Sequence, residues 1–292
     1  MNKTENKTHT LLLEETKKDR KKAQSIFKSL RDKICNTIEE IENYDTDKKI
    51  QFSIDSWNRK GGGGGESKNL RGRVIEKAGV HLSTVFGELP YGALDEEKST
   101  NTSEFWASGI SVIVHPKNPF VPSVHMNLRM IVTNDFWFGG GADLTPMLHS
   151  KRNSNDTDTI LFHESMRKAC QEYPFAKYKE FKENCDKYFF IKHRKENRGT
   201  GGIFFDRFKS EQTSSDFLFL NDVGNNFIKT YKQIILSNMS KEWNDNHRME
   251  QLHYRGRYVE FNLMYDKGTL FGLKTGGNID SILSSLPPIV SW

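Results

Sequence analysis

The chain has 292 residues, and its 43 Lys and Arg residues outnumber its 38 Asp and Glu residues, which gives a net charge of +5. With 35% hydrophobic, 12% aromatic and 28% charged residues, the composition excludes a disordered chain and a membrane protein and indicates a globular one. No apolar run approaches the roughly 20 residues that span a bilayer, and the first twenty residues do not resemble a signal peptide, so we expect a cytoplasmic protein.

The N-terminal part of the chain predicts a flexible segment followed by a long helix. Residues 1–20 are polar and charged, so we expect them to be flexible and a single domain to occupy residues 21–292. From Ala23 to Ile41 apolar residues recur every three or four positions. This spacing predicts an amphipathic helix that ends near residues 43–47.

A run of five glycines, residues 61–65, follows the predicted helix. Glycine loses more conformational freedom on folding than other residues, so we expect the run to break regular structure. Strand-like content resumes over residues 71–85 without a change in composition. The run is therefore interpreted as a loop inside the domain.

Two segments in the middle of the chain alternate with the period of two that is typical of a strand. Over residues 110–115, Ser111 and His115 share one face, and over residues 124–132 every second residue is apolar. The opposite face of the second segment carries three polar side chains, namely His125, Asn127 and Arg129. Half-apolar strands of this kind favour an antiparallel sheet.

The rest of the chain predicts further helices and a last strand. Apolar residues recur with helical spacing over residues 160–170, 175–188 and 217–235, whereas residues 258–265 alternate as a strand does. These elements together predict an α+β fold, a single domain in which helices pack against an antiparallel sheet.

The polar face of residues 124–132 is a candidate site for an anionic ligand. At about 3.3 Å per residue, His125, Asn127 and Arg129 lie within about 14 Å of one another. An arginine fork matches a carboxylate, and a histidine exchanges protons near neutral pH. The alternative is a solvated face with an incidental ion pair.

Other motifs argue against binding of nucleotides and nucleic acids. No Gly-Lys-Ser/Thr follows residues 61–65, and residues 199–202 lack the register of a dinucleotide fingerprint. Basic residues are not concentrated around residues 255–257, which disfavours nucleic acid. The glycines of residues 137–146 have two interpretations, close approach of the backbone to a ligand or a turn at a strand end.

A metal site is only weakly indicated, because no pair of histidines has the i, i+4 spacing of a zincin. The candidate ligands are His115, His125, His163 and His193, for which structural or substrate roles are favoured. The three cysteines form no Cys-x-x-Cys motif, so neither a disulfide framework nor an iron–sulfur cluster is predicted.

Several long strings, in order along the chain, resemble one known family. They are WNRKGGGGG (57–65), EKAGVHLSTVFG (76–87), SVIVHPKNPFVPSVHMNLRM (111–130), WFGGGADLTP (137–146), HRKENRGTGGIFFD (193–206), RGRYVEFNLMYDKGTLFGLKTGG (255–277) and SILSSLPP (281–288). From about residue 50 to its end, the chain is similar to the aerobic, oxygen-dependent coproporphyrinogen III oxidases. The joint occurrence of these strings makes the resemblance specific.

The resemblance implies an enzyme of haem biosynthesis that uses O2 and no organic cofactor. Such an enzyme converts two propionates of coproporphyrinogen III to vinyls and gives protoporphyrinogen IX, CO2 and H2O2. The implied fold is a large flat antiparallel sheet with helices on both faces. The implied assembly is a homodimer, which we expect to form through the C-terminal strand region, about residues 258–292.

The resemblance also implies roles for particular residues. His125 matches the proton donor of the family. The positions that match substrate-binding residues are Ser111, Asn127, Leu128, Arg129, Gly276, Gly277 and Asn278. The four candidate histidines match proposed ligands of a divalent metal, a requirement that differs among members.

Asp206 is predicted to be a second catalytic residue. The apolar residues 203–205 should carry it toward the interior, where a carboxylate needs a partner. In one interpretation the pyrrole N–H groups of the substrate are that partner. In the other, Asp206 belongs to a structural ion pair with Arg198 or Arg207.

The chain departs from the family pattern at two relevant positions. Arg207 stands where a second acid is usual, and Asn278 stands where an arginine is usual. The lost cation leaves a tetrapyrrole-binding protein without turnover as an alternative, and a histidine-ligated metal oxidase of other specificity is a third possibility. The retained His125, Asn127 and Arg129 favour an active enzyme.

Overall fold

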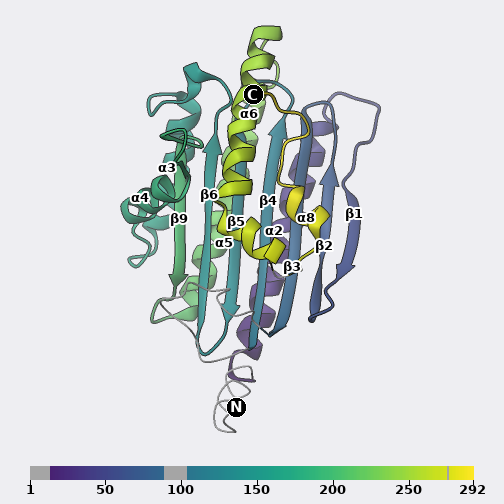
Figure 1. The fold of residues 1–292 in the computed structure, drawn as a ribbon. Helices are drawn as coiled ribbons and strands as arrows, with labels where there is room; N and C mark the ends of the chain where they lie inside the picture. Colours follow the sequence, from purple (N-terminus) through teal and green to yellow (C-terminus); the bar gives the residue numbers. More distant parts are fainter. Residues whose placement is uncertain (1–13, 89–103, 275) are drawn as a thin grey trace.

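The computed structural model describes residues 14–88, 104–274 and 276–292, and seven of its strands form one antiparallel sheet in the order β1-β2-β3-β4-β5-β6-β9 (Figure 1). The strands are β1 (Ser53–Asn58), β2 (Gly63–Leu70), β3 (Ile75–Glu88), β4 (Glu104–Pro116), β5 (Ser123–Val132), β6 (Phe136–Thr145) and β9 (Gly201–Phe208). A separate two-stranded sheet pairs β7 (Phe190–Ile191) with β8 (Glu196–Asn197). The predicted α+β class with an antiparallel sheet is therefore confirmed.

Helices lie on both faces of the large sheet. Figure 1 shows α2 and α5 behind it and α6, α7 and α8 in front of it. The helices are α2 (Lys17–Glu42), α3 (Thr157–Gln171), α4 (Tyr178–Tyr188), α5 (Thr213–Asn238), α6 (Asp245–Met264), α7 (Lys267–Lys274) and α8 (Ile279–Leu283), with a short 3₁₀ turn η2 (His149–Lys151).

The main hydrophobic core lies between the sheet and α2, α3 and α5. Alternate residues of β5, such as Met126 and Leu128, are fully buried there beside Ile34 of α2 and Phe227 of α5. The apolar residues at every second position of the strand thus pack against the apolar stripes of the helices, which recur every 3.6 residues. The polar side chains of β5 consequently point to the opposite face.

On that opposite face, α6 and the C-terminal segment cover part of the sheet. Arg255 of α6 is fully buried and donates hydrogen bonds to the backbone oxygen of Pro116 and to Glu76. Farther along, the Ser284 hydroxyl contacts His81, and Lys77 donates to the backbone oxygen of Leu286. Polar contacts therefore hold these segments over β3 and β4.

Most of the predicted elements are present. The first helix ends at Glu42, followed by Asn43 as its C-cap, and the three later helical patterns correspond to α3, α4 and α5. The two central strands are β4 and β5 with the predicted faces. Of the predicted flexible N-terminus, residues 1–13 lie outside the described residues, and α2 begins at Lys17.

The predicted strand over residues 258–265 is wrong, because this segment belongs to α6. Its buried residues recur at helical spacing, at Tyr254, Tyr258 and Phe261, whereas Leu263 is 43% exposed. The eight-residue window was too short to distinguish a period of two from a helix, since the helical stripe extends N-terminally through polar side chains. Asn244, well upstream, caps this helix.

The prediction that all five glycines interrupt regular structure is also wrong. Gly61 and Gly62 form the turn after β1, but residues 63–65 belong to β2, which pairs with β1 and β3 on its two sides. Gly63 has a φ of +83°, and an added Cβ would lie 2.1 Å from the Thr84 backbone oxygen. Glycine is thus required by close strand pairing rather than by a loop.

No helix among the described residues is long and apolar enough to cross a membrane. The three cysteines, Cys35, Cys170 and Cys185, are buried free thiols. Burial raises the pKa of the Cys35 and Cys170 thiols to about 12, so these groups stay protonated and unreactive at neutral pH.

Candidate active site

A row of paired residues, four of them glycine or serine, crosses the face of the sheet that carries α6 to α8. Because paired residues of antiparallel strands point to the same face, the register defines this row across five strand pairs. Its members are Trp57, Gly65, Ser83, Gly109, Arg129 and Gly139. Two glycines and a serine between Trp57 and Arg129, with a further glycine beyond Arg129, make a low floor, which suits a broad, flat ligand.

Arg129, on β5, is held at this floor by two neighbours. Its Nη1 donates to Asn127 Oδ1 at 3.0 Å, and its Nη2 donates to Asp206 Oδ1 at 2.7 Å. A Cβ on Gly139 would lie 2.8 Å from Arg129 Nε and 2.8 Å from Asp206 Oδ1. Gly139 therefore leaves room for the guanidinium to lie across β6, with its remaining N–H groups available to a ligand.

His125, two strand steps from Asn127, forms a dyad with Asp143 of β6. The two residues are directly paired in the ladder, and His125 Nδ1 donates to Asp143 Oδ1 at 3.0 Å. The histidine side chain is 23% exposed, and the aspartate side chain is 2% exposed. Asp143 thereby fixes the tautomer and directs His125 Nε2, which has no hydrogen-bond partner among the described residues, away from the dyad.

Arg198 supports Asp143 from the loop before β9. Its Nη2 donates to both carboxylate oxygens at 2.9 and 2.8 Å, and its Nη1 donates to Asn262 at 3.0 Å. Burial opposes ionisation of Asp143, but the Arg198 and His125 contacts outweigh it and hold the pKa of the carboxyl below its usual range. Asp143 is therefore a carboxylate at neutral pH.

Aromatic rings enclose the Arg198 guanidinium. Its Cζ lies 4.0 Å from the ring centre of Phe189, 4.5 Å from that of Tyr258 and 4.8 Å from that of Phe261. Phe189 follows α4, and the other two rings belong to α6. Two separate segments therefore hold the Arg198 guanidinium in place. Sequence reasoning did not assign Asp143 or this role of Arg198, because no local spacing connects them.

The expectation that Asp206 lies in the interior is wrong. Its side chain is 46% exposed, because the strand is near its end and Arg207 takes a positive φ of 49°. Its ion-pair partner is Arg129 rather than Arg198 or Arg207. Arg207 instead places its Cζ 4.8 Å from the ring centre of Trp137. The residue that departs from the family pattern thus places its cation over Trp137.

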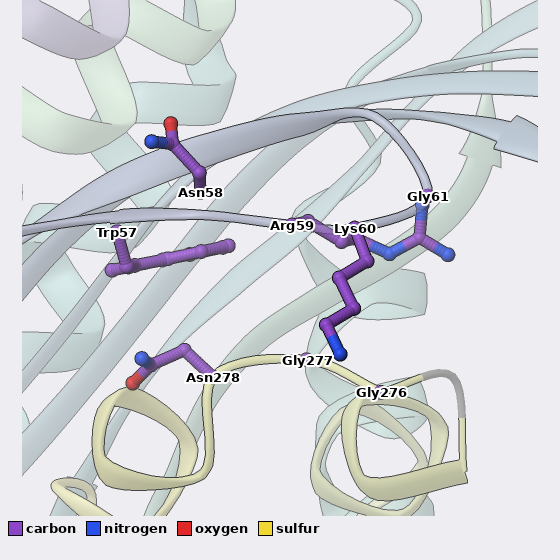
Figure 2. Close-up of a pocket in the computed structure, with 8 residues that line it drawn as sticks. All are labelled: Trp57, Asn58, Arg59, Lys60, Gly61, Gly276, Gly277 and Asn278. Carbon is purple, nitrogen blue, oxygen red and sulfur yellow. The ribbon is translucent and has the colours of Figure 1, made fainter.

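The structure separates the residues that the resemblance assigns to substrate binding. Ser111 pairs with Asn127 in the ladder, so both point to the site face. Leu128 has its side chain fully buried in the core on the other face, as strand alternation requires. Residues 276–278 line a pocket beside the turn between β1 and β2, as Figure 2 shows.

The glycine string of residues 137–146 forms most of β6, so the interpretation as a turn is wrong. A Cβ on Gly140 would lie 2.4 Å from the Asn127 backbone oxygen, and one on Gly141 would lie 2.4 Å from that of Ile203. The glycines allow close packing of three strands and keep the floor of the site low.

The four histidines predicted as metal ligands are not brought together. No group of three or more His, Cys, Asp or Glu side chains suited to a metal occurs within the described part of the chain. His115 uses both ring nitrogens on Ser123 and the Ser285 backbone oxygen, and burial lowers its pKa. His163 and His193 likewise have hydrogen bonds at both nitrogens. These four residues therefore do not fit a shared metal centre within one chain.

Comparison with known proteins gives a consistent result. The family model described as coproporphyrinogen III oxidase matches residues 22–292. An oxygen-dependent coproporphyrinogen-III oxidase of Rickettsia bellii (strain RML369-C) is 44% identical over 281 residues, which cover 94% of this chain and 99% of the relative. The protein of the same name from Rickettsia africae is 42% identical over 92% of this chain and 96% of its own.

Proposed function

The chain belongs to the coproporphyrinogen III oxidase family, and on this premise we propose that the face around His125, Arg129 and Asp206 is its active site. The activity is the oxygen-dependent decarboxylation of two propionates of coproporphyrinogen III to vinyls in haem biosynthesis. The observation that carries the site assignment is the His125–Asp143 dyad next to an arginine on a floor of glycines.

The balance of the reaction explains why a proton donor is needed. Each propionate, one proton and O2 give a vinyl, CO2 and H2O2, so one proton is taken up for each decarboxylation. His125 supplies it from Nε2, while Nδ1–H is held by the Asp143 carboxylate. After donation, Nδ1–H still bonds Asp143, and the ring keeps its orientation.

Arg129 and Asp206 together match the two kinds of polar group on the substrate. The propionates are anionic and bind the Arg129 fork, whereas the pyrrole N–H groups are donors and bind the Asp206 carboxylate. The Arg129–Asp206 ion pair positions both groups before the substrate arrives. We propose that the Asp206 carboxylate accepts a hydrogen bond from a pyrrole N–H. This interaction raises the electron density of the ring for reaction with O2.

Replacing Arg129 by Lys is expected to raise KM about tenfold or more while leaving folding nearly intact. The lysine keeps the charge, but it loses the fork that bonds Asn127, Asp206 and the propionate, a loss of about 1.5–3 kcal/mol. Initial rates across substrate concentrations measure the effect. Equal KM and kcat in the variant and the unaltered chain would instead support the alternative that the polar face of β5 is a solvated surface with an incidental ion pair.

The substrate and the oxidant are tested directly by an assay of protoporphyrinogen IX and CO2 formation from coproporphyrinogen III. Turnover is expected under air and not under argon. Binding without product under air would support the alternative of a tetrapyrrole-binding protein. The same assay with a chelator tests whether a divalent metal is required. The cytoplasmic location stays a prediction.

The predicted homodimer is proposed to use the exposed apolar side chains of α6, α7, α8 and the C-terminal end rather than a strand. These are Leu263, Met264, Leu273, Ile279, Ile289 and Trp292, each at least 41% exposed. Light scattering is expected to give twice the chain mass of 33.8 kDa. The double variant Met264→Glu/Ile279→Glu should shift the mass to the monomer, because it places charges in an apolar contact.

The matched control is Leu236→Glu, since this leucine is 45% exposed on α5, on the other face of the sheet. It should leave the dimer intact. A monomer in the unaltered chain at micromolar concentration contradicts the proposal.

A further inference from the structure

A pocket of about 400 Å³ lies between the turn that follows β1 and the segment that precedes α8. Residues 57–61 form one wall, and residues 276–278 form the other (Figure 2). Trp57 supplies its apolar side, since the indole lies over Gly65 so closely that a Cβ there would be 2.5 Å from the ring. The indole Nε1 is covered and has no hydrogen-bond partner among the described residues.

Asn278 gives this pocket neither a charge nor a free side-chain acceptor. Its Oδ1 accepts a hydrogen bond from the backbone N–H of Ser281 at 2.8 Å and so caps α8. The two glycines before it contribute backbone only. The position at which the family pattern has an arginine therefore caps a helix in this chain and brings no cation to the pocket.

Two cations line the opposite wall, and they differ in their contacts. Arg59 donates from Nη1 to the Phe86 backbone oxygen at 3.0 Å, and its Cζ lies 5.7 Å from the ring centre of Phe105. Lys60 makes no ion pair with any acid in the described part of the chain. Figure 2 shows its side chain extending from the turn toward the Gly276–Gly277 segment.

We infer that Lys60 binds a substrate carboxylate in this pocket and supplies the cation that Asn278 lacks. This inference rests on the proposed function. Trp57 stands in the same sheet row as Arg129, four strand spacings or about 19 Å away, across a floor that includes Gly65 and Gly109. Lys60 lies in the turn three residues after Trp57, so this row separates two long cationic side chains, Lys60 and Arg129. This arrangement suits a broad ligand that carries carboxylates on opposite sides.

The test compares Lys60→Met with Lys229→Met, a control at an exposed lysine of α5 on the other face. Lys60→Met is expected to raise KM for coproporphyrinogen III about five- to tenfold and to leave kcat within about twofold. The rise of KM with added salt should also be weaker in this variant, because one charge interaction is already absent. The control should match the unaltered chain in all three quantities.

A charge relocation provides the second arm. The double variant Lys60→Met/Asn278→Arg should recover most of the lost affinity, measured as KM and by fluorescence titration with coproporphyrin III. If Lys60→Met has the same KM, kcat and salt dependence as the control variant, the inference about Lys60 is overturned. Turnover by the unaltered chain would still support the proposed function. Where the Asn278→Arg change lowers the melting temperature through the lost cap, the titration of Lys60→Met alone decides. No turnover by the unaltered chain overturns the proposed function itself.

Discussion

Replacing His125 by Gln is expected to lower kcat by about 10²- to 10⁴-fold, the usual contribution of a positioned proton donor. Glutamine keeps a hydrogen bond to Asp143 but cannot carry the proton that each decarboxylation takes up. The melting temperature should change little, because the His125 side chain is 23% exposed and the change removes one edge-on ring contact, with Phe189 at 6.2 Å between ring centres. Single-turnover rates under air, with product quantified, measure the loss.

His253→Gln is the matched control, because this histidine is exposed on α6 and lies outside the proposed site. It should retain the rate of the unaltered chain. A His125→Gln variant that turns over within about twofold of the control would remove His125 as the proton donor, and a neighbouring water or acid would have to supply the proton.

The site face of β5 could be predicted from the sequence because strand alternation is local. His125, Asn127 and Arg129 occur at every second residue, and the apolar residues between them fix which face enters the core. The same rule places Leu128 away from the substrate, although it stands inside the matching triplet. A family motif gives positions, but the backbone decides which side chains reach the site.

The partners of the site residues could not be predicted, because they depend on register and on contacts between distant segments. Arg129 meets Asp206 only through the order β5-β6-β9, and a bulge between Phe138 and Gly140 sets their approach. The apolar run before Asp206 indicated burial correctly for Phe205, which is 1% exposed. It gave no sign that β9 ends two residues after Asp206, at Phe208, and leaves the carboxylate 46% exposed.

The strand predicted over residues 258–265 was wrong because contacts between distant segments also decide which side chains of α6 are buried. α6 buries a fully charged Arg255 and polar Gln251, so its buried stripe is not an apolar one. Hydrophobic periodicity detects apolar stripes only. Both side chains bond the Pro116 backbone oxygen, a long-range contact that satisfies them in the interior.

Replacing Asp143 by Asn is expected to destabilise the fold by about 3–5 kcal/mol as well as to impair turnover. The change leaves the Arg198 guanidinium, whose side chain is 2% exposed, without its counterion inside a ring of aromatic side chains. It also removes the carboxylate that accepts the hydrogen bond from His125 Nδ1 and orients the ring. For a chain of this size the melting temperature should fall by about 10 °C.

The pH dependence and a double variant separate the two effects of Asp143. Because its pKa is lowered in the folded state, its contribution is present above the unfolded pKa of about 3.9 and is lost as the pH falls through the lower folded value. The difference in free energy of unfolding between the unaltered chain and Asp143→Asn, measured by urea unfolding, should therefore narrow only below about pH 4.

The double variant Asp143→Leu/Arg198→Met removes both charges and should recover much of the stability, since an apolar pair can replace a buried ion pair. It should not recover turnover, because His125 would still lack its carboxylate; a double variant with normal turnover would limit Asp143 to a structural role.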